Sequence, residues 1–336
     1  MSVPVITAET LRACVGFQDL IEPVARAFQE YSSGRANANF LAIFPAERPE
    51  LGDVYIKTGS IGGYPMFIVK VSPWFAANIE SGSGQGGFVA VLDAQTGHTL
   101  AILAEEHYLS DIRTAAAGAL AARTLAPAVV RTAAVIGTGA QAFWQPQALF
   151  HVRPFESLSI WGRESIKAHQ LAERLRPLLA GVTVTVSNDL ESVVRSSDVL
   201  ITATASREPL IEGAWLHAGQ HVTAVGADDQ TKCELDADSL RRADRLIVDS
   251  IETNRRNGDV SRHLSRGAIQ LEQIHGELGA VLSGAVDGRR SETEITIAKL
   301  VGLGVQDLAA AEVSLSRLGL YSREADRSLD ETIVLT

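Results

Sequence analysis

Cysteine is scarce in this chain, and it contains no long apolar run. The 336 residues include two cysteines, Cys14 and Cys233, which lie too far apart in sequence to suggest a disulfide framework or a metal-binding knuckle. No apolar run approaches the roughly 18 residues that a membrane-spanning helix needs, so we expect no membrane partner. The first residues, MSVPVITAETLR, lack a basic stretch followed by an apolar core, and we expect no signal peptide. A reducing cytoplasm is the expected compartment.

Positive charge is also in short supply. The 30 lysines and arginines stand against 40 aspartates and glutamates, and the formal charge of −10 argues against nucleic acid as a partner. The eight histidines form no metal-ligand motif, since Gly219 lies between the spaced pair His217 and His221, and we expect no metal. With 46% hydrophobic and 21% charged residues, the composition is typical of a soluble globular protein. The length suits one large domain or two moderate ones.

The first third of the chain predicts a helix followed by a small sheet. Residues 17–33 place apolar side chains at helical spacing. From 52 to 104, short alternating runs such as DVYIKTG and MFIVKVS are separated by glycine-rich turns, which indicates an antiparallel or mixed sheet. The alanine-rich segment 109–126 then predicts a long helix with Ser110 or Asp111 as its N-cap.

From residue 132 onward the pattern alternates between strands and helices. TAAVIG is typical of a buried strand, AQAFWQPQALFH of a helix, SLSIWGR of a strand and ESIKAHQLAERLRPLLA of an amphipathic helix. Further β-rich runs follow, the stretch 252–292 is less periodic, and a last strand, a glycine turn and a helix come after it. This alternation predicts an α/β fold with a Rossmann-type, doubly wound parallel sheet.

A glycine motif stands between the first strand and the first helix of this series. Gly137-x-Gly139-x-x-Ala142 has the spacing of a dinucleotide-binding turn, in which Gly137 permits the tight turn and Gly139 lets the backbone approach a pyrophosphate. Ala142 is small enough for close packing of the helix on the strand, and the helix N-terminus offers N–H donors to a phosphate. Alone, the triplet is equally a simple tight connection. Its place in the strand–helix series favours the dinucleotide site.

The end of the second strand bears on which dinucleotide binds. NAD-dependent enzymes usually place Asp or Glu there, whereas this chain has WGRES, with Arg163 before the first acid, Glu164. A guanidinium can pair with a 2′-phosphate and stack on adenine. Arg163 therefore favours NADP(H) over NAD(H); the alternative is that it is a solvated loop arginine.

A set of ordered motifs resembles the ornithine cyclodeaminase/mu-crystallin family. The motifs are LSDIRTAAAGALAARTLA with AAVIGTGAQA, then VLITATAS, VGADDQTKCELD and KLVGLGVQDLAAAE, and they extend from about residue 52 to 312. The resemblance implies a Rossmann domain, 119–309, inserted into a smaller α+β domain formed by 1–118 and 310–336, which binds substrate and dimerises. It also implies a homodimer and NAD(P)(H)-dependent chemistry that interconverts amino acids and imines or cyclises ornithine with loss of ammonia.

The resemblance also implies site residues. The family's substrate-binding lysine matches Lys70, which we expect to serve catalysis as well, and its arginine matches Arg113. A guanidinium can hold a carboxylate bidentately while an ammonium adds a point charge; the alternatives are a surface lysine and an arginine paired with Asp111. The catalytic aspartate matches Asp228, where a carboxyl group can exchange a proton with the substrate nitrogen, and Asp229 is the alternative. The positions that match cofactor contacts are Ala140, Gln141, Thr204, Val225, Gly226 and Ala227.

One departure from the family's pattern concerns the substrate. Ornithine cyclodeaminases place a glutamate thirteen residues before the binding lysine, where this chain has Lys57. A lysine there repels the distal ammonium of ornithine, at a cost of about 1–4 kcal/mol, and can share in binding the carboxylate. We therefore expect NAD(P)H-dependent reduction of a 2-imino acid of the Δ1-pyrroline-2-carboxylate type. The alternatives are an amino-acid cyclodeaminase with bound NAD and a mu-crystallin-like, NADPH-dependent ligand-binding protein.

Overall fold

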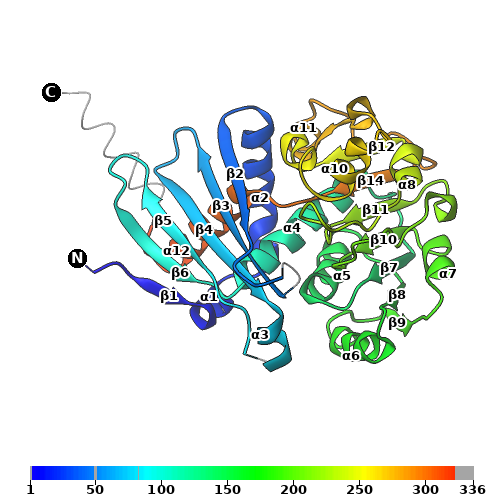
Figure 1. Cartoon of the computed structure of the whole chain (residues 1–336), viewed down its shortest axis with the longest axis horizontal. Helices are drawn as coiled ribbons and strands as arrows, with labels where there is room; N and C mark the ends of the chain where they lie inside the picture. The colour runs from blue at the N-terminus through cyan, green and yellow to red at the C-terminus, as the bar shows by residue number, and fades with distance from the viewer. Residues whose placement is uncertain (1, 49–50, 82, 322–336) are drawn as a thin grey trace. The chain divides into compact units, whose positions relative to one another are not determined.

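Two compact units make up the chain in a computed structural model (Figure 1). The described residues are 2–48, 51–81 and 83–321. One unit combines the residues up to Arg113 with those from Leu303 onward, and the other spans Thr114–Gly302. Within the described ranges, no helix has both the length and the hydropathy that crossing a bilayer would require.

The domain limits expected from the sequence, 118/119 and 309/310, fall inside two helices. These are α4 (Tyr108–Leu125) and α12 (Gly304–Arg317). The expected first domain also included residues 322–336, which lie outside the described residues. The substrate-binding and dimerisation role expected of that domain stays a prediction.

The first unit is built on a six-stranded sheet in the order β1-β6-β5-β4-β3-β2. β1 pairs in parallel with β6, and all other neighbours in this sheet are antiparallel. Its strands are β1 (Val5–Thr7), β2 (Ala36–Ile43), β3 (Gly52–Ile61), β4 (Met66–Phe75), β5 (Phe88–Asp93) and β6 (Thr99–Ala104). The mixed sheet expected between residues 52 and 104 is confirmed, and β1 and β2 extend it at both edges.

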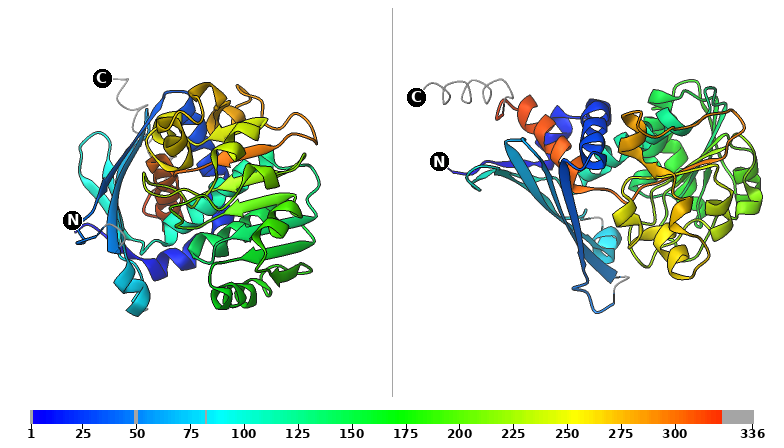
Figure 2. Two further views of the ribbon diagram at one scale, coloured as in Figure 1. Left: turned by 45° about the vertical axis from the view of Figure 1, so that its right-hand side comes forward. Right: turned by 90° about the horizontal axis from the view of Figure 1, so that it is seen from above.

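Helices α2 (Phe17–Ser32) and α12 lie side by side on one face of this sheet (Figure 2). The helix expected at 17–33 is thus confirmed as α2. α12 comes from the far end of the sequence and rests on β3 through Gly304 and Gly59: a Cβ on Gly59 would stand 2.4 Å from the Gly304 carbonyl oxygen. Such a close backbone approach requires glycine on both elements. The short helices of this unit are α1 (Ala8–Cys14) and α3 (Ala76–Ser81).

The opposite face of the sheet carries an apolar row, and Figure 2 shows no helix of this unit over that face in the described residues. The strand registers place Leu41, Ile56, Val71 and Phe88 opposite one another in a row across four strands. Leu41 is 56% exposed and Phe88 is 37% exposed. Single exposed apolar residues are common on proteins, whereas a continuous apolar surface is typical of an interface.

The second unit is built on an eight-stranded parallel sheet in the order β13-β12-β14-β11-β10-β7-β8-β9. Its strands are β7 (Thr132–Ile136), β8 (Ser157–Trp161), β9 (Thr183–Val186), β10 (Val199–Thr202), β11 (His221–Ala224), β12 (Arg245–Val248), β13 (Gly276–Glu277) and β14 (Thr296–Lys299). Its helices after α4 are α5 (Ala140–Val152), α6 (Ser165–Leu175), α7 (Leu190–Arg195), α8 (Ala237–Arg242), α9 (Ile251–Asn254), α10 (Gly258–Ser265) and α11 (Leu278–Leu282). The doubly wound α/β fold expected from the sequence is confirmed.

Both faces of the parallel sheet are buried, as β7 shows. Its residues Ala134 and Ile136 belong to one apolar core, while Ala133 and Val135 belong to a second core. Successive side chains on a strand point to opposite faces, so a strand between two helical layers is apolar throughout. This is why the run TAAVI predicted a buried strand correctly.

The start of α4 differs from the expectation. The helix begins at Tyr108, before both residues proposed as its N-cap. The acid that accepts at the start of the helix is Glu105, three residues before it, whose carboxylate accepts hydrogen bonds from the backbone N–H of Ser110 (2.7 Å) and from the Ser110 hydroxyl (2.6 Å). The prediction of Ser110 or Asp111 as the cap was therefore wrong: the capping acid lies upstream of the alanine-rich segment.

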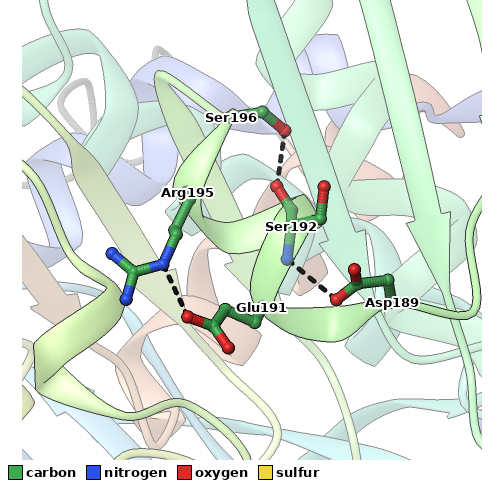
Figure 3. A pocket seen from close by; sticks show the side chains of 5 residues that line it. All are labelled: Asp189, Glu191, Ser192, Arg195 and Ser196. Atoms are coloured by element: carbon green, nitrogen blue, oxygen red, sulfur yellow. Dashed lines mark hydrogen bonds and ion pairs between the residues drawn. The ribbon is translucent and has the colours of Figure 1, made fainter.

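At α7 the cap is local. Asp189 accepts a hydrogen bond from the Ser192 N–H at 3.0 Å, and Glu191 pairs with Arg195 at 2.7 Å (Figure 3). These residues line a shallow polar hollow together with Ser196, whose hydroxyl donates to the Ser192 carbonyl at 2.8 Å. Arg195 is paired with Glu191 and Asp189 with the Ser192 N–H, and we assign the hollow no ligand.

Candidate active site

The glycine turn expected to hold a dinucleotide connects β7 with α5. Gly137 adopts a φ of 128° and donates its N–H to the Trp161 carbonyl at 2.9 Å. A Cβ on Gly137 would stand 2.3 Å from the Ala203 carbonyl oxygen, so glycine alone fits this turn. At Gly139, which directly precedes α5, no described atom other than those of the glycine and its two chain neighbours lies within 4 Å of the Cβ position. The backbone there is open to the close approach of a ligand.

The surroundings of this turn are those of a dinucleotide-binding fold. β7 lies between β8 and β10, so the order of strands reverses beside it, and ligands bind at such switch points. Ala140 and Gln141 are the first two residues of α5, at the helix end that favours anions. Ala142 is fully buried in the core that also contains Val135 of β7, which provides the close packing expected of a small residue.

Arg163 lies on an exposed loop between β8 and α6. The first acid after the strand, Glu164, pairs with Lys167 on the surface of α6 at 2.7 Å. An exposed guanidinium suits contact with a phosphate and also suits a solvated loop. The preference for NADP(H) therefore stays a prediction.

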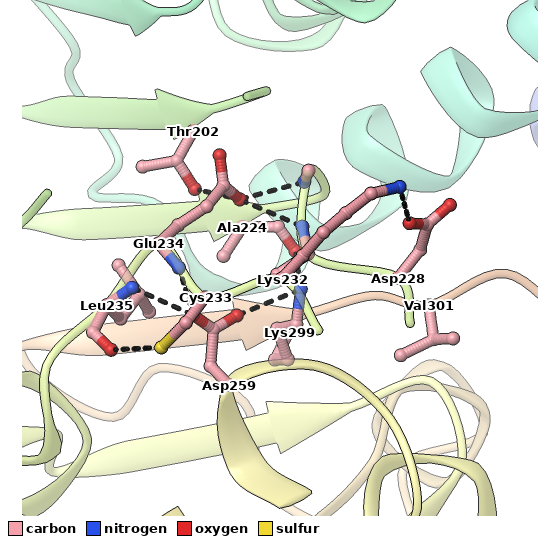
Figure 4. Close-up of polar contacts among 12 residues, drawn as sticks. Thr202, Ala224, Asp228, Lys232, Cys233, Glu234, Leu235, Asp259, Lys299 and Val301 are labelled. Carbon is pink, nitrogen blue, oxygen red and sulfur yellow. Dashed lines mark hydrogen bonds and ion pairs between the residues drawn. The ribbon is translucent and has the colours of Figure 1, made fainter. Parts of the chain in front are cut away.

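A single carboxylate, that of Glu234, binds the loops that follow β10 and β11 (Figure 4). One oxygen accepts hydrogen bonds from the Thr204 N–H (2.6 Å) and the Thr204 hydroxyl (2.9 Å). The other accepts from the Thr202 hydroxyl (2.8 Å) and from the N–H groups of Gly226 (2.8 Å) and Ala227 (3.2 Å). The N–H groups of Thr204, Gly226 and Ala227 thus point to Glu234, so these residues can meet a cofactor only through their other atoms.

A buried ion pair lies behind Glu234. Lys299 Nζ is 3.1 Å from Asp259 Oδ2, and neither side chain is exposed. Asp259 Oδ1 accepts a hydrogen bond from the backbone N–H of Glu234 at 2.6 Å. In the loop after β11, the Val225 N–H donates to the carbonyl oxygen of Thr202, the last residue of β10, at 2.9 Å. Burial raises the pKa of Glu234. The sequence analysis missed Glu234, Asp259 and Lys299, since each is an ordinary charged residue in its own segment.

The two aspartates after β11 have different surroundings. Asp229 is buried, and its carboxylate accepts hydrogen bonds from the Thr231 N–H (2.6 Å), the Thr231 hydroxyl (2.8 Å) and the Lys232 N–H (3.0 Å). Burial opposes the ionisation of Asp229, but Lys232 and Thr231 outweigh it and hold its pKa below the usual value. The side chain of Asp228 is 29% exposed and accepts a hydrogen bond from Lys232 Nζ at 2.6 Å (Figure 4). Asp229 therefore closes a turn, while Asp228 keeps an accessible carboxylate.

In the first unit, Lys57 and Lys70 face each other across β3 and β4. The register pairs them directly, and they are 5% and 1% exposed. Like charges opposite each other on a sheet are destabilising, so this pair needs anionic neighbours. Lys57 Nζ also lies 5.3 Å from the centroid of the Phe40 ring, within cation–π range.

Asp307, in the first turn of α12, provides one of these anions. Its Oδ1 accepts hydrogen bonds from Lys70 Nζ (3.0 Å) and Arg113 Nε (3.1 Å), and all three side chains are buried. Gln306 accepts a hydrogen bond from Arg113 Nη1 at 2.9 Å. Burial raises the pKa of Asp307, but the charges of Arg113, Lys70 and Lys57 outweigh it and hold the pKa below its ordinary value. The sequence analysis quoted the motif that contains Asp307 and gave it no role.

Glu105 is the second anion, and the backbone next to it is strained. Its carboxylate lies 3.7 Å from Lys70 Nζ. Glu106 and His107 both have positive φ values, 48° and 65°, which is costly for residues other than glycine and is common at functional sites. His107 Nε2 lies 2.8 Å from the Pro73 carbonyl oxygen and therefore carries the hydrogen. Burial and then the Lys70 charge lower the pKa of His107, so its ring is neutral at neutral pH.

The family model of the ornithine cyclodeaminase/mu-crystallin family matches this chain over residues 4–318. The chain belongs to this family. An uncharacterized cyclodeaminase from Sinorhizobium fredii is 39% identical over 267 residues, which cover 79% of this chain and 80% of the relative. The solved structure of a Δ1-pyrroline-2-carboxylate reductase from Thermococcus litoralis, in complex with NADH and L-proline, is similar with a TM-score of 0.87 and 28% identity, covering 94% of this chain and 97% of that one. The solved structure of an archaeal alanine dehydrogenase dimer with bound NAD is similar with a TM-score of 0.86 and 28% identity, covering 94% of this chain and 96% of that one.

These matches confirm the resemblance inferred from the ordered motifs and the Rossmann-type fold of this ornithine cyclodeaminase/mu-crystallin family member. They also confirm the expectation of an enzyme that uses a nicotinamide cofactor. The roles of individual residues, the form of the cofactor and the substrate stay predictions. In the part of the chain that the structure describes, no group of three His, Cys, Asp or Glu side chains is placed to hold a metal ion.

Proposed function

We propose that this family member reduces a 2-imino acid to the corresponding amino acid with NAD(P)H. The observation that carries the proposal is the orientation of Arg113. Asp307 and Gln306 engage Nε and Nη1, while Nη2 makes no hydrogen bond within the described residues. A guanidinium held in this way offers its remaining edge to a planar carboxylate. Lys70, which shares Asp307 with Arg113, adds a second cation.

The glycine turn fits a dinucleotide, because Gly139 is open to close approach and the start of α5 supplies N–H donors. The residues that would hold the pyrophosphate are Gly137, Gly139, Ala140 and Gln141, with Ala142 behind them. Those on the nicotinamide side are Thr204, Val225, Gly226 and Ala227, and Arg163 would meet the 2′-phosphate of NADP(H). When bound, the cofactor supplies the hydride for the imine carbon.

The chain's own side chains supply binding and proton handling. Lys70 and Arg113 bind the substrate carboxylate, and Lys57 adds positive charge that disfavours a diamino acid. Asp228 exchanges a proton with the substrate nitrogen. Its carboxylate is accessible and paired with Lys232, in contrast to that of Asp229. General acid–base catalysis of this kind contributes about 10²–10⁴-fold to a rate.

An NADPH-oxidation screen tests the proposal. Its substrates are imino acids formed from 2-oxo acids with ammonia or methylamine, together with cyclic imines. We expect turnover of at least one of them. Arg113→Ala should lower kcat/KM by the equivalent of about 2–5 kcal/mol, because a buried charge pair loses one partner, while NADPH affinity stays within a few-fold. Near-normal kcat/KM in this variant would place the carboxylate site elsewhere.

The name of the Sinorhizobium fredii relative, an uncharacterized cyclodeaminase, favours a second candidate function, that of a cyclodeaminase. In this alternative the chain acts on an amino acid and keeps NAD bound. Adding ornithine to the screen, with ammonia measured alongside cofactor oxidation, separates the two. Ammonia released from ornithine without net cofactor oxidation would support the cyclodeaminase. Tight NADPH binding without turnover of any substrate would support a mu-crystallin-like binding protein.

We also propose a homodimer that forms through the uncovered face of the six-stranded sheet. The row of Leu41, Ile56, Val71 and Phe88 supports this, since a second copy would bury the same apolar row on both partners. The archaeal alanine dehydrogenase structure is a dimer. Sedimentation velocity should therefore give the mass of two chains.

A further inference from the structure

We propose that Glu234 is a positioning residue, which sets the two loops on the nicotinamide side of the cofactor site before the cofactor binds. The inference rests on the proposed function, because it takes these loops as cofactor contacts. Glu234 is fully buried and lies behind both loops (Figure 4). Its Oε1 binds Thr204 after β10, and its Oε2 binds Gly226 and Ala227 after β11.

A carboxylate is the one side chain that can make this set of contacts. Each oxygen accepts at least two hydrogen bonds, and both backbone loops present N–H donors. Glutamine has a single acceptor oxygen, and its NH₂ group would face the N–H donors of one loop. Replacing Glu234 by glutamine should therefore keep the shape and release one of the two loops.

The loops themselves are in backbone contact, so they act as a set. A Cβ on Gly226 would stand 2.3 Å from the Thr204 carbonyl oxygen and 2.4 Å from Glu234 Oε1. A Cβ on Gly137 would stand 2.3 Å from the Ala203 carbonyl oxygen. The turns after β7, β10 and β11 therefore pack directly on one another, with Glu234 tying two of them together.

The backbone of Glu234 is itself fixed. Asp259 accepts hydrogen bonds from the N–H groups of Glu234 (2.6 Å) and Leu235 (2.8 Å), and Lys299 neutralises Asp259. Groups that are held by a buried second layer are already in place when a ligand arrives, and binding then does not have to order them. This arrangement predicts that Glu234 contributes to affinity for the nicotinamide half of the cofactor only.

Two ligands of the full-length chain test this prediction: NADPH, and 2′-phospho-ADP-ribose, which lacks the nicotinamide. For Glu234→Gln we expect NADPH affinity to fall by about 10-fold or more, the equivalent of about 1.4 kcal/mol, while affinity for 2′-phospho-ADP-ribose stays within about 2-fold. The matched control is Asp198→Asn. Asp198 accepts hydrogen bonds from the N–H groups of Arg131 and Thr132, both at 2.8 Å, at the amino ends of β10 and β7 in the same sheet. This control should leave both affinities unchanged.

A second variant covers the case in which Glu234→Gln does not fold. Thr202→Val removes one hydroxyl donor to Glu234 from within β10 and keeps the side-chain shape. It should weaken NADPH binding by about 3-fold, because the free energy lost is a fraction of that of one charged hydrogen bond. The affinity for 2′-phospho-ADP-ribose should stay unchanged. If both variants lower the two affinities equally, or lower neither, Glu234 has a structural role only and the inference fails. If the wild-type chain binds NADH in place of NADPH, NADH and ADP-ribose are the two ligands of the same test; a wild-type chain that binds none of the four would instead refute the proposed function.

Discussion

Replacing Asp307 by asparagine should destabilise the first unit strongly. The carboxylate lies 3.0 Å from Lys70 Nζ and 3.1 Å from Arg113 Nε, and each contact is worth a gross Coulomb energy of about 5 kcal/mol at an effective dielectric constant of 20. Desolvation offsets much of this. Removing one partner of a buried ion pair has a net cost of about 3–5 kcal/mol, because the remaining charges stay buried. The thermal midpoint should fall by roughly 6–20 °C.

Thermal unfolding as a function of pH and of added acetate measures the effect. The pKa of Asp307 is lowered in the folded state, so its contribution to stability is present above its ordinary pKa of 3.8 and is lost as the pH falls through the folded-state value. The difference in thermal midpoint between wild type and Asp307→Asn should therefore become smaller in acid. Acetate should raise the midpoint of Asp307→Ala more than that of wild type, because its carboxylate can occupy the space that the truncated side chain leaves beside Lys70 and Arg113.

Asp93→Asn is the matched control for this experiment. Asp93 belongs to the same unit and has a lowered pKa, but it accepts its hydrogen bonds from Thr96 and Gln95 in an exposed turn rather than from buried cations. Its loss should cost about 1 kcal/mol or less. A change of that size for Asp307→Asn at neutral pH would refute the reasoning, since Lys70 and Arg113 would then not depend on Asp307.

Three further predictions concern cofactor, proton transfer and assembly. Arg163→Ala should reduce the preference for NADPH over NADH by roughly 1–3 kcal/mol; equal dissociation constants for the two in the wild type would contradict a 2′-phosphate contact. Asp228→Asn should lower kcat by about 10²–10⁴-fold with cofactor binding intact, whereas Asp229→Asn should act mainly on stability; the reverse pattern in a kinetic and unfolding comparison would exchange their roles. Leu41→Glu should give a monomer in sedimentation velocity, and an intact dimer would move the interface to another face.

The sequence predicted an element correctly where the spacing of its apolar residues matches the faces that are buried in the fold. β7 is apolar throughout because helices cover both of its faces, and α2 keeps helical spacing because one face of it is buried. β2 was not predicted. Residues 36–39 of this strand alternate between alanine and asparagine, but residues 40–43 are all apolar, so the polar–apolar alternation that marks a half-buried strand stops after four residues.

The residues that the sequence analysis missed act only through tertiary contacts. Lys70 meets Asp307 from 237 residues away, and Glu234 binds a threonine 30 residues before it. Both acids lie in motifs that carry the family resemblance, VGADDQTKCELD and KLVGLGVQDLAAAE, but a motif does not say which distant side chains an acid contacts. The positive φ of His107 is likewise imposed by the fold. By contrast, Lys57, Lys70 and Arg113 were predicted, and the structure brings Lys70 and Arg113 together on one carboxylate.

The distance in sequence between β4 and α12 also has a consequence for synthesis. Ribosomes add about 5–20 residues per second, so Lys70 leaves the ribosome roughly 10–50 s before Asp307. During this time the sheet of the first unit has no α12 to cover it, and its paired lysines lack their main counter-charge. The second unit is complete once Gly302 has been made, five residues before Asp307. A chaperone that binds nascent chains would therefore meet the first unit in its open form for nearly the whole time that the second unit is being made.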